Sequence, residues 1–210
     1  MVQYGRMQVV QQFNLPKTTY HEVNYRLVVI HYTFWKAVVF VNVDMGHPFV
    51  RSVINTVQRY NHKQYWRMRN EVVSSTSNRS KITRLIYLLR IKRMDAFNNA
   101  SMGTDLGSGA QFSGPPTLYH GLNGIVVSHF AKIGKNCTIY QRVTIAEGAD
   151  RKAATIGDNC IVGAGAVIIG GVTIGNSVKI GANCVVTKDV PGNSTVVGNP
   201  GVVIGNDVTE

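Results

Sequence analysis

One histidine of this sequence stands where the chain could present a proton acceptor. Gly121 follows His120 and Gly124 lies close behind, so a short excursion of the backbone can hold the imidazole at an edge. Imidazole is the side chain best suited to proton transfer near neutral pH. Asp105 lies fifteen residues earlier and could fix the tautomer of the ring. The pair predicts general-base catalysis, with His120 as the base and Asp105 as its partner.

A six-residue repeat must position these two groups. Aliphatic residues recur in one phase at Val127, Ile133, Ile139, Ile145, Ile156, Val162, Ile168, Ile174, Ile180 and Val186, with five extra residues after Ile145. Small residues hold a second phase, four positions after each of these. Neither a helix nor an alternating strand has period six, whereas a solenoid with three short parallel strands per coil does. The phase can be traced back to Leu106, Phe112 and Leu118, and His120 lies in the irregular gap before Val127.

A helical region is expected before the repeat. Val50, Val53, Ile54 and Val57 fit one face of a helix, while Ile82, Leu85, Ile86 and Leu89 fit a second helix that Ser80 can cap. We therefore predict a mostly helical region over residues 1–103 and a β-helical domain over 104–205. The fold class is mainly β, with a smaller N-terminal α-helical part.

The three cysteines follow from the same repeat. Cys137, Cys160 and Cys184 all occupy its small, inward phase, so they should pack as small apolar side chains in the core. A redox pair formed by Cys137 and Cys160 is the alternative. A complete disulfide framework is excluded by the odd count, and no secretory signal is seen at Met1, so we expect a cytoplasmic protein.

Composition and charge exclude several classes of protein. A hydrophobic content of 44% with 16% charged residues argues against disorder, and the longest apolar run, residues 27–43, is interrupted by His31, Lys36 and Asn42. Basic residues exceed acidic ones by eleven, and the part before Tyr119 holds fifteen basic and five acidic residues. No nucleic-acid-binding module is recognisable. The second predicted helix is basic, with Lys81, Arg84, Arg90, Lys92 and Arg93. It either packs on the solenoid with its charges in solvent or contacts an anionic membrane surface.

The repeat resembles the hexapeptide-repeat acyltransferases, and within them the serine acetyltransferase branch with its polysaccharide-acetylating relatives. The resemblance runs from about Tyr65 to Pro200. It is carried by His120-Gly-Leu-Asn-Gly-Ile-Val-Val127, Ala131-Lys-Ile-Gly134, Gln141-Arg-Val-Thr-Ile145, Ile156-Gly-Asp-Asn159, Gly163-Ala-Gly-Ala166, Lys179-Ile-Gly-Ala182 and Thr187-Lys-Asp-Val-Pro191. It implies a left-handed parallel β-helix, a homotrimer, and acetyl-CoA as co-substrate bound between neighbouring coils.

Residue roles follow from the resemblance. His120 matches the family's general base and Asp105 matches the carboxylate of its His–Asp pair. Acetyl-CoA would contact Gly163, Ala164, Gly181 and Ala182 along a backbone groove, with Lys179 and Lys188 near its phosphates. Arg151, in the insertion after Ile145, would contact the acceptor. His129 sits at an outward position, where surface exposure is more usual than a place in the acceptor site. His120 and His129 are the two histidines of the repeat region. A three-histidine metal site would need one more, so no metal is expected.

Two departures from the family pattern guide the choice of acceptor. Serine acetyltransferases have an aspartate where this chain has Tyr119 and a histidine where it has Lys152. The chain lacks a carboxylate that could pair with an ammonium, and it gains an aromatic ring that could stack on a sugar. Both changes favour a hydroxyl of a sugar or polysaccharide precursor as the acetyl acceptor. Serine O-acetylation is the alternative, and a non-catalytic scaffold is a third hypothesis, because fold alone does not determine chemistry.

Overall fold

The computed structural model describes residues 26–29, 39–42 and 47–206 of the 210-residue chain. Contacts divide the chain into two units, Met1–Arg51 and Ser52–Glu210. In the first unit, β1 (Arg26–Val29) pairs antiparallel with β2 (Val39–Asn42). The interrupting residues His31 and Lys36 of the apolar run lie outside the described residues. Among the described residues, no helix is both long enough and apolar enough to cross a membrane.

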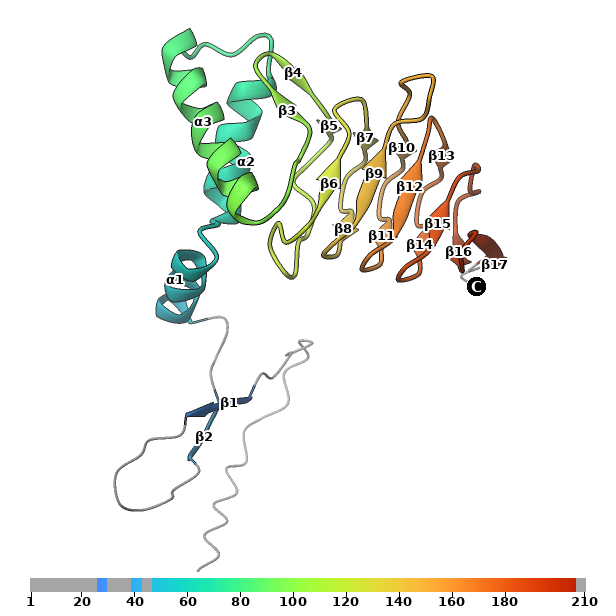
Figure 1. Cartoon of the computed structure of the whole chain (residues 1–210), viewed down its shortest axis with the longest axis horizontal. Coiled ribbons are helices and arrows are strands. Elements are labelled where there is room, and N and C mark those ends of the chain that lie inside the picture. The colour runs from blue at the N-terminus through green and yellow to red at the C-terminus, as the bar shows by residue number, and fades with distance from the viewer. Residues whose placement is uncertain (1–25, 30–38, 43–46, 207–210) are drawn as a thin grey trace, which may run out of the picture. The chain divides into compact units, whose positions relative to one another are not determined.

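Parallel strands wind into a β-helix along most of the second unit (Figure 1). Within the described residues three sheets form its sides. One holds β5 (Gln111–Phe112), β7 (Lys132–Ile133), β10 (Thr155–Ile156) and β13 (Thr173–Ile174). The next holds β6 (Val126–Val127), β9 (Thr144–Ala146), β12 (Val167–Ile169) and β15 (Val185–Val186). The last holds β8 (Thr138–Ile139), β11 (Ile161–Val162), β14 (Lys179–Ile180) and β16 (Ser194–Val197), closed by antiparallel β17 (Val202–Asn206).

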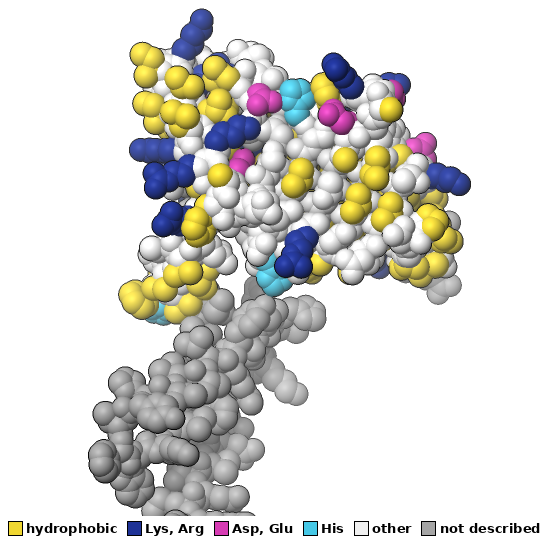
Figure 2. Space-filling model, in the orientation of Figure 1, with side chains coloured by type: hydrophobic (Ala, Val, Ile, Leu, Met, Phe, Trp, Pro, Cys, Tyr) yellow, Lys and Arg dark blue, Asp and Glu magenta, His cyan; other side chains and the backbone are white. Residues whose placement is uncertain are grey.

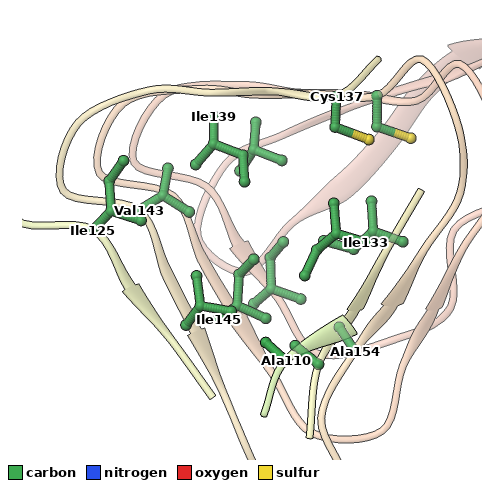
Figure 3. Packing of buried hydrophobic residues seen from close by; sticks show 14 of the residues in the cluster. Ala110, Ile125, Ile133, Cys137, Ile139, Val143, Ile145 and Ala154 are labelled. Carbon is green, nitrogen blue, oxygen red and sulfur yellow. The ribbon is translucent and has the colours of Figure 1, made fainter. Parts of the chain in front are cut away.

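The six-residue phase is confirmed at every one of its ten positions. Each of the ten aliphatic residues lies in one of the strands β6 to β15, and none is more than 2% exposed. Figure 3 shows Ile133, Ile139 and Ile145 pointing from the three sides into one interior. Cys137, Cys160 and Cys184 are free and buried, as the core interpretation predicts. The part of the chain from β5 to β16 is therefore the predicted left-handed parallel β-helix of hexapeptide repeats.

The insertion and the first coil depart from the expected phase. Ala149 was expected to point inward, but it is exposed, and Ala154 takes the inward position after the five extra residues. Leu106 is 47% exposed, because the chain there forms a hairpin of β3 (Thr104–Asp105) and β4 (Ser108–Gly109) instead of a coil. Glycines with positive φ at 103, 107 and 109 permit this reversal.

The described helices are α1 (Pro48–Val57), α2 (His62–Val73) and α3 (Lys81–Phe97). As predicted, Ser80 caps α3 by accepting a hydrogen bond from the Thr83 amide at 3.2 Å. Figure 1 shows α2 and α3 at the end of the β-helix where β3 and β4 lie. The buried side of α3 carries Ile91 and Asp95, so the stripe that begins at Ile82 remains exposed.

A buried polar network attaches the helices to the first coil. Tyr65 donates its hydroxyl to Asp95 Oδ1 at 2.7 Å. The guanidinium of Arg69 donates to the Met102 and Ala110 carbonyls and to the Thr104 hydroxyl. Since the hydroxyl acceptor sits next to Asp105 in β3, this network also fixes the hairpin that carries Asp105.

Candidate active site

The corner that follows β6 brings together an aspartate and a histidine. Asp105 Oδ2 lies 2.7 Å from Nδ1 of His129. Two backbone features create this contact: Ser101 pairs in parallel with Val126, and Gly103 passes so close to His129 that a Cβ at 103 would lie 2.9 Å from its Cα. The β3–β4 hairpin therefore places the carboxylate beside the residues that follow β6.

A cation and an aromatic ring complete the surroundings of this pair. Lys92 Nζ, from α3, lies 3.8 Å from Asp105 Oδ1. The Phe130 ring stands edge-on to the imidazole, with ring centroids 4.4 Å apart. Side chains of His129 and Asp105 are 41% and 50% exposed, so the pair faces solvent. It is a surface dyad at the rim of a hollow.

The hollow is a pocket of about 570 Å³ whose polar lining includes His129, Glu147 and Arg151. Val127 pairs with Ile145 in register, so His129 and Glu147, two residues further on, occupy equivalent positions on adjacent coils. The rest of the lining is Val126, Ser128, Phe130, Ile145 and Ala146. The pocket thus carries an imidazole, a carboxylate and a guanidinium.

Residues 147–152 form the loop that delivers Arg151. The loop is closed by hydrogen bonds from the Gly148 amide to the Lys152 carbonyl and from the Arg151 amide to the Gly148 carbonyl. Asp150 pairs with Lys152 Nζ at 3.4 Å, and Arg151 itself has a φ of 57°. Neither Glu147 nor Arg151 takes part in an ion pair within the described residues. Both charges are therefore available to a bound molecule.

His120 lies at a different corner, in the turn that precedes β6. Its exposed ring lies 6.4 Å from that of Tyr140, and Tyr119, 65% exposed, lies 5.6 Å from the same ring. Asp105 does not pair with it as expected. Because the hairpin lies alongside the residues after β6, the carboxylate reaches His129 instead. The place of His120 in the reaction stays a prediction.

The residues expected to contact acetyl-CoA gather at the corner after β11 and β14, with one exception. Gly163 and Gly181 stack on adjacent coils, and a Cβ at 163 would lie 2.7 Å from the amide nitrogen of Ala182. Ala164 and Ala182 follow these glycines, Lys179 lies in β14, and Lys188 follows β15. The stacking explains the glycines, and contact with acetyl-CoA stays a prediction.

The sequence pattern did not single out Glu147 as a pocket residue, and it placed His129 at an outward position, where its side chain is 41% exposed. The signal for Glu147 was available, because it lies one 18-residue coil after His129. The contact between His129 and Asp105 could not be predicted from the sequence, because it depends on the β3–β4 hairpin that carries Asp105. Among the described residues, no group of three His, Cys, Asp or Glu side chains could hold a metal ion.

Comparisons with known proteins identify the repeat. Residues 153–188 match the family described as bacterial transferase hexapeptide (six repeats). The serine acetyltransferase of Staphylococcus xylosus is 43% identical over 108 residues, 50% of each chain, and that of Mycobacterium tuberculosis is 38% identical over 112 residues, 52% of this chain and 48% of that one. The chain spans about half the length of these curated relatives. The crystal structure of Neisseria gonorrhoeae serine acetyltransferase is 25% identical, with a TM-score of 0.51 over 79% of this chain and 76% of that one.

These relatives correct the expected acceptor. The prediction of a sugar or polysaccharide hydroxyl, and of a place in polysaccharide biosynthesis, is wrong, because the relatives in sequence and structure are serine acetyltransferases. The prediction rested on the carboxylate lost at Tyr119, whereas Glu147 supplies one in the pocket. The predicted resemblance to the hexapeptide-repeat acyltransferases is confirmed over the β-helix, where the family model and the serine acetyltransferases match this chain.

Proposed function

We propose that this protein transfers an acetyl group from acetyl-CoA to the hydroxyl of serine. The observation that carries the proposal is the pocket after β6 and β9, which is lined by Glu147, Arg151 and His129. The imidazole of His129 is hydrogen-bonded to Asp105. The similarity to serine acetyltransferases supports the same reaction.

A free amino acid is a zwitterion, so it needs a partner of each sign. The guanidinium of Arg151 can bind the α-carboxylate through two parallel hydrogen bonds, and the carboxylate of Glu147 can accept from the α-ammonium. Both side chains line the same pocket without an ion-pair partner among the described residues. A neutral sugar would leave these two charges unpaired.

Acetyl-CoA supplies the activated thioester. Ala164 and Ala182, which follow the stacked Gly163 and Gly181, are small and would leave room for a thin pantetheine chain along this corner. Lys179 and Lys188 would add positive charge for the phosphates. The bond from acetyl carbon to sulfur breaks as the bond to the serine oxygen forms. An imidazole takes the hydroxyl proton and returns it to the leaving thiolate. We propose a homotrimer as the working assembly.

Free thiol release, followed with wild-type protein and acetyl-CoA, tests this reaction. Serine should accelerate release and yield O-acetylserine by mass spectrometry, whereas threonine, a neutral monosaccharide and buffer alone should give little. Equal rates with and without serine would contradict the acceptor. A non-catalytic scaffold would show no thermal stabilisation by acetyl-CoA, whereas a binding protein at 100 times Kd gains about 2.7 kcal/mol.

A further inference from the structure

We propose that a pocket between α2 and α3 binds the phosphate group of a phosphate ester. The pocket has a volume of about 240 Å³ and is lined by Arg59, Gln64, Met68, Arg90, Arg93 and Met94. It shares no lining residue with the pocket after β6 and β9, so this inference is independent of the proposed acetyl transfer.

Positive charge dominates the helices that form this pocket. Residues 59–97 include ten basic and two acidic side chains. Both acidic side chains have partners elsewhere: Asp95 is buried and accepts a hydrogen bond from Tyr65, and Glu71 lies 3.9 Å from Arg79. No carboxylate is among the described residues that line the pocket. The three arginines therefore have no counter-charge from the helices around them.

The side chains of these arginines are also without hydrogen-bond acceptors. Elsewhere on the helices, Arg69 donates inside the core and Arg84 donates to two backbone carbonyls. By contrast, the side chains of Arg90 and Arg93 make no hydrogen bond or ion pair among the described residues. The same holds for Arg59, whose guanidinium lies over the Phe97 ring, 4.6 Å from its centroid. Their N–H groups are available to a ligand.

The chemistry of the lining matches a phosphate ester. Three like charges around one hollow repel one another, so an anion bound between them would stabilise the folded protein. A guanidinium donates two parallel hydrogen bonds to a phosphate, which carries about two negative charges and three acceptor oxygens as a monoester. A carboxylate offers one charge and two oxygens. Beneath the arginines, buried Met68 and half-buried Met94 can contact the ester carbons.

Two sources could bring such a phosphate to the pocket, a soluble ester or a lipid head group. Ile86 and Leu89 precede Arg93 by seven and four residues, so all three lie on one face of α3. The pocket is therefore at one end of the exposed apolar stripe that begins at Ile82. A head group held by the arginines would leave its acyl chains beside this stripe.

Titration calorimetry with inorganic pyrophosphate tests the pocket. Saturating coenzyme A is present throughout, so that pyrophosphate does not enter a site for acetyl-CoA, and ionic strength is constant. Wild type should bind pyrophosphate, and Arg90→Gln and Arg93→Gln should bind it about 10- to 100-fold more weakly, as expected for lost charged hydrogen bonds. Arg93→Lys, which keeps the charge but not the paired donors, should also bind more weakly than wild type.

Lys81→Gln is the matched control. It removes one charge from the same helix, nine residues before Arg90 and about 14 Å away along the axis, and should bind pyrophosphate like wild type. Thermal unfolding without pyrophosphate should show Arg93→Gln to be at least as stable as wild type, because one repelling charge is gone. No binding by wild type, equal binding by Arg93→Gln, or an equal loss in Lys81→Gln would each overturn the phosphate site.

Vesicles distinguish the two sources. Wild type is sedimented with phosphatidylcholine vesicles that contain phosphatidic acid, again at constant ionic strength. If the pocket holds the lipid head group, pyrophosphate should release the protein from the vesicles, and Arg93→Gln should bind them more weakly. Vesicle binding that pyrophosphate does not change, together with pyrophosphate binding that Arg93→Gln weakens, supports a soluble phosphate ester as the ligand.

Discussion

Glu147 occupies the coil position directly above that of His129, and this stacking gives the pocket its negative charge. If its carboxylate binds the ammonium of serine, it does so equally in the ground state and in the transition state. Glu147→Gln should therefore raise KM for serine about 10- to 100-fold with kcat nearly unchanged, as expected for one lost charged hydrogen bond. Steady-state kinetics with serine as the varied substrate measures both constants.

A matched control lies in the same loop. Asp150 pairs with Lys152, so Asp150→Asn removes one negative charge without touching the pocket lining. It should leave KM for serine close to wild type. An equal rise of KM in both variants would show that Glu147 acts only through the general field of the loop.

Site residues could be predicted from the sequence only in part. Arg151, which the resemblance predicts as an acceptor contact, lines the same pocket as His129, for which the repeat predicts an outward, exposed position. The partner of Asp105 could not be predicted, because spacing by fifteen residues assumes a regular coil, and the chain from Thr104 to Gly109 is a hairpin. Glu147 was overlooked because the missing carboxylate was sought only at the position of Tyr119.

At the scale of elements, the hexapeptide repeat determines nearly the whole β-helix. Its ten aliphatic positions are confirmed because one inward residue per six fixes which side of each strand is buried. The helices behave differently. A stripe from Ile82 to Leu89 predicts helix α3 but not its orientation, since its residues are exposed and the helix packs through Ile91 and Asp95. Periodicity finds an apolar face without saying what covers it.

The docking of α2 and α3 has a pH signature. Burial raises the pKa of Asp95 to about 6, although the hydrogen bond from Tyr65 lowers it in part. The second carboxylate oxygen, Oδ2, has no hydrogen-bond partner within the described residues. Because its pKa is raised in the folded protein, the carboxyl group of Asp95 favours folding most below about pH 4, where it is protonated in both the folded and the unfolded protein. That contribution is lost as the pH rises through about 6, and amounts to about 3 kcal/mol at most.

Asp95→Asn should remove this dependence. The free energy of unfolding of wild type, relative to that of Asp95→Asn, should fall between pH 4 and pH 6, as measured by urea denaturation at a series of pH values. Taking the difference cancels the other titrating groups. Parallel curves for the two proteins would mean that Asp95 has the same proton affinity folded and unfolded.

At the scale of the molecule, charge and exposed apolar surface coincide on α3. Ile82, Leu85, Ile86 and Leu89 are 47% to 73% exposed. Figure 2 shows hydrophobic side chains gathered over this helix with Lys and Arg beside them. An amphipathic helix with cations along its apolar face is typical of proteins that bind anionic membrane surfaces. The predicted trimer would present three such helices, which strengthens weak contacts.

Membrane contact through α3 therefore predicts that the full chain sediments with vesicles of phosphatidylcholine and phosphatidylglycerol but not with phosphatidylcholine alone. High salt should reduce the bound fraction, because the surface charges are screened. Reversing two cations of α3, Arg90→Glu with Arg93→Glu, should abolish sedimentation, whereas the same charge change on the β-helix, Lys132→Glu with Lys135→Glu, should largely preserve it. If both double variants reduce vesicle binding equally, only the net charge of the protein matters and the proposed contact through α3 is wrong. The apolar stripe of α3 would then be covered by another protein surface. Light scattering of the pure chain would reveal such a contact between copies as a larger assembly.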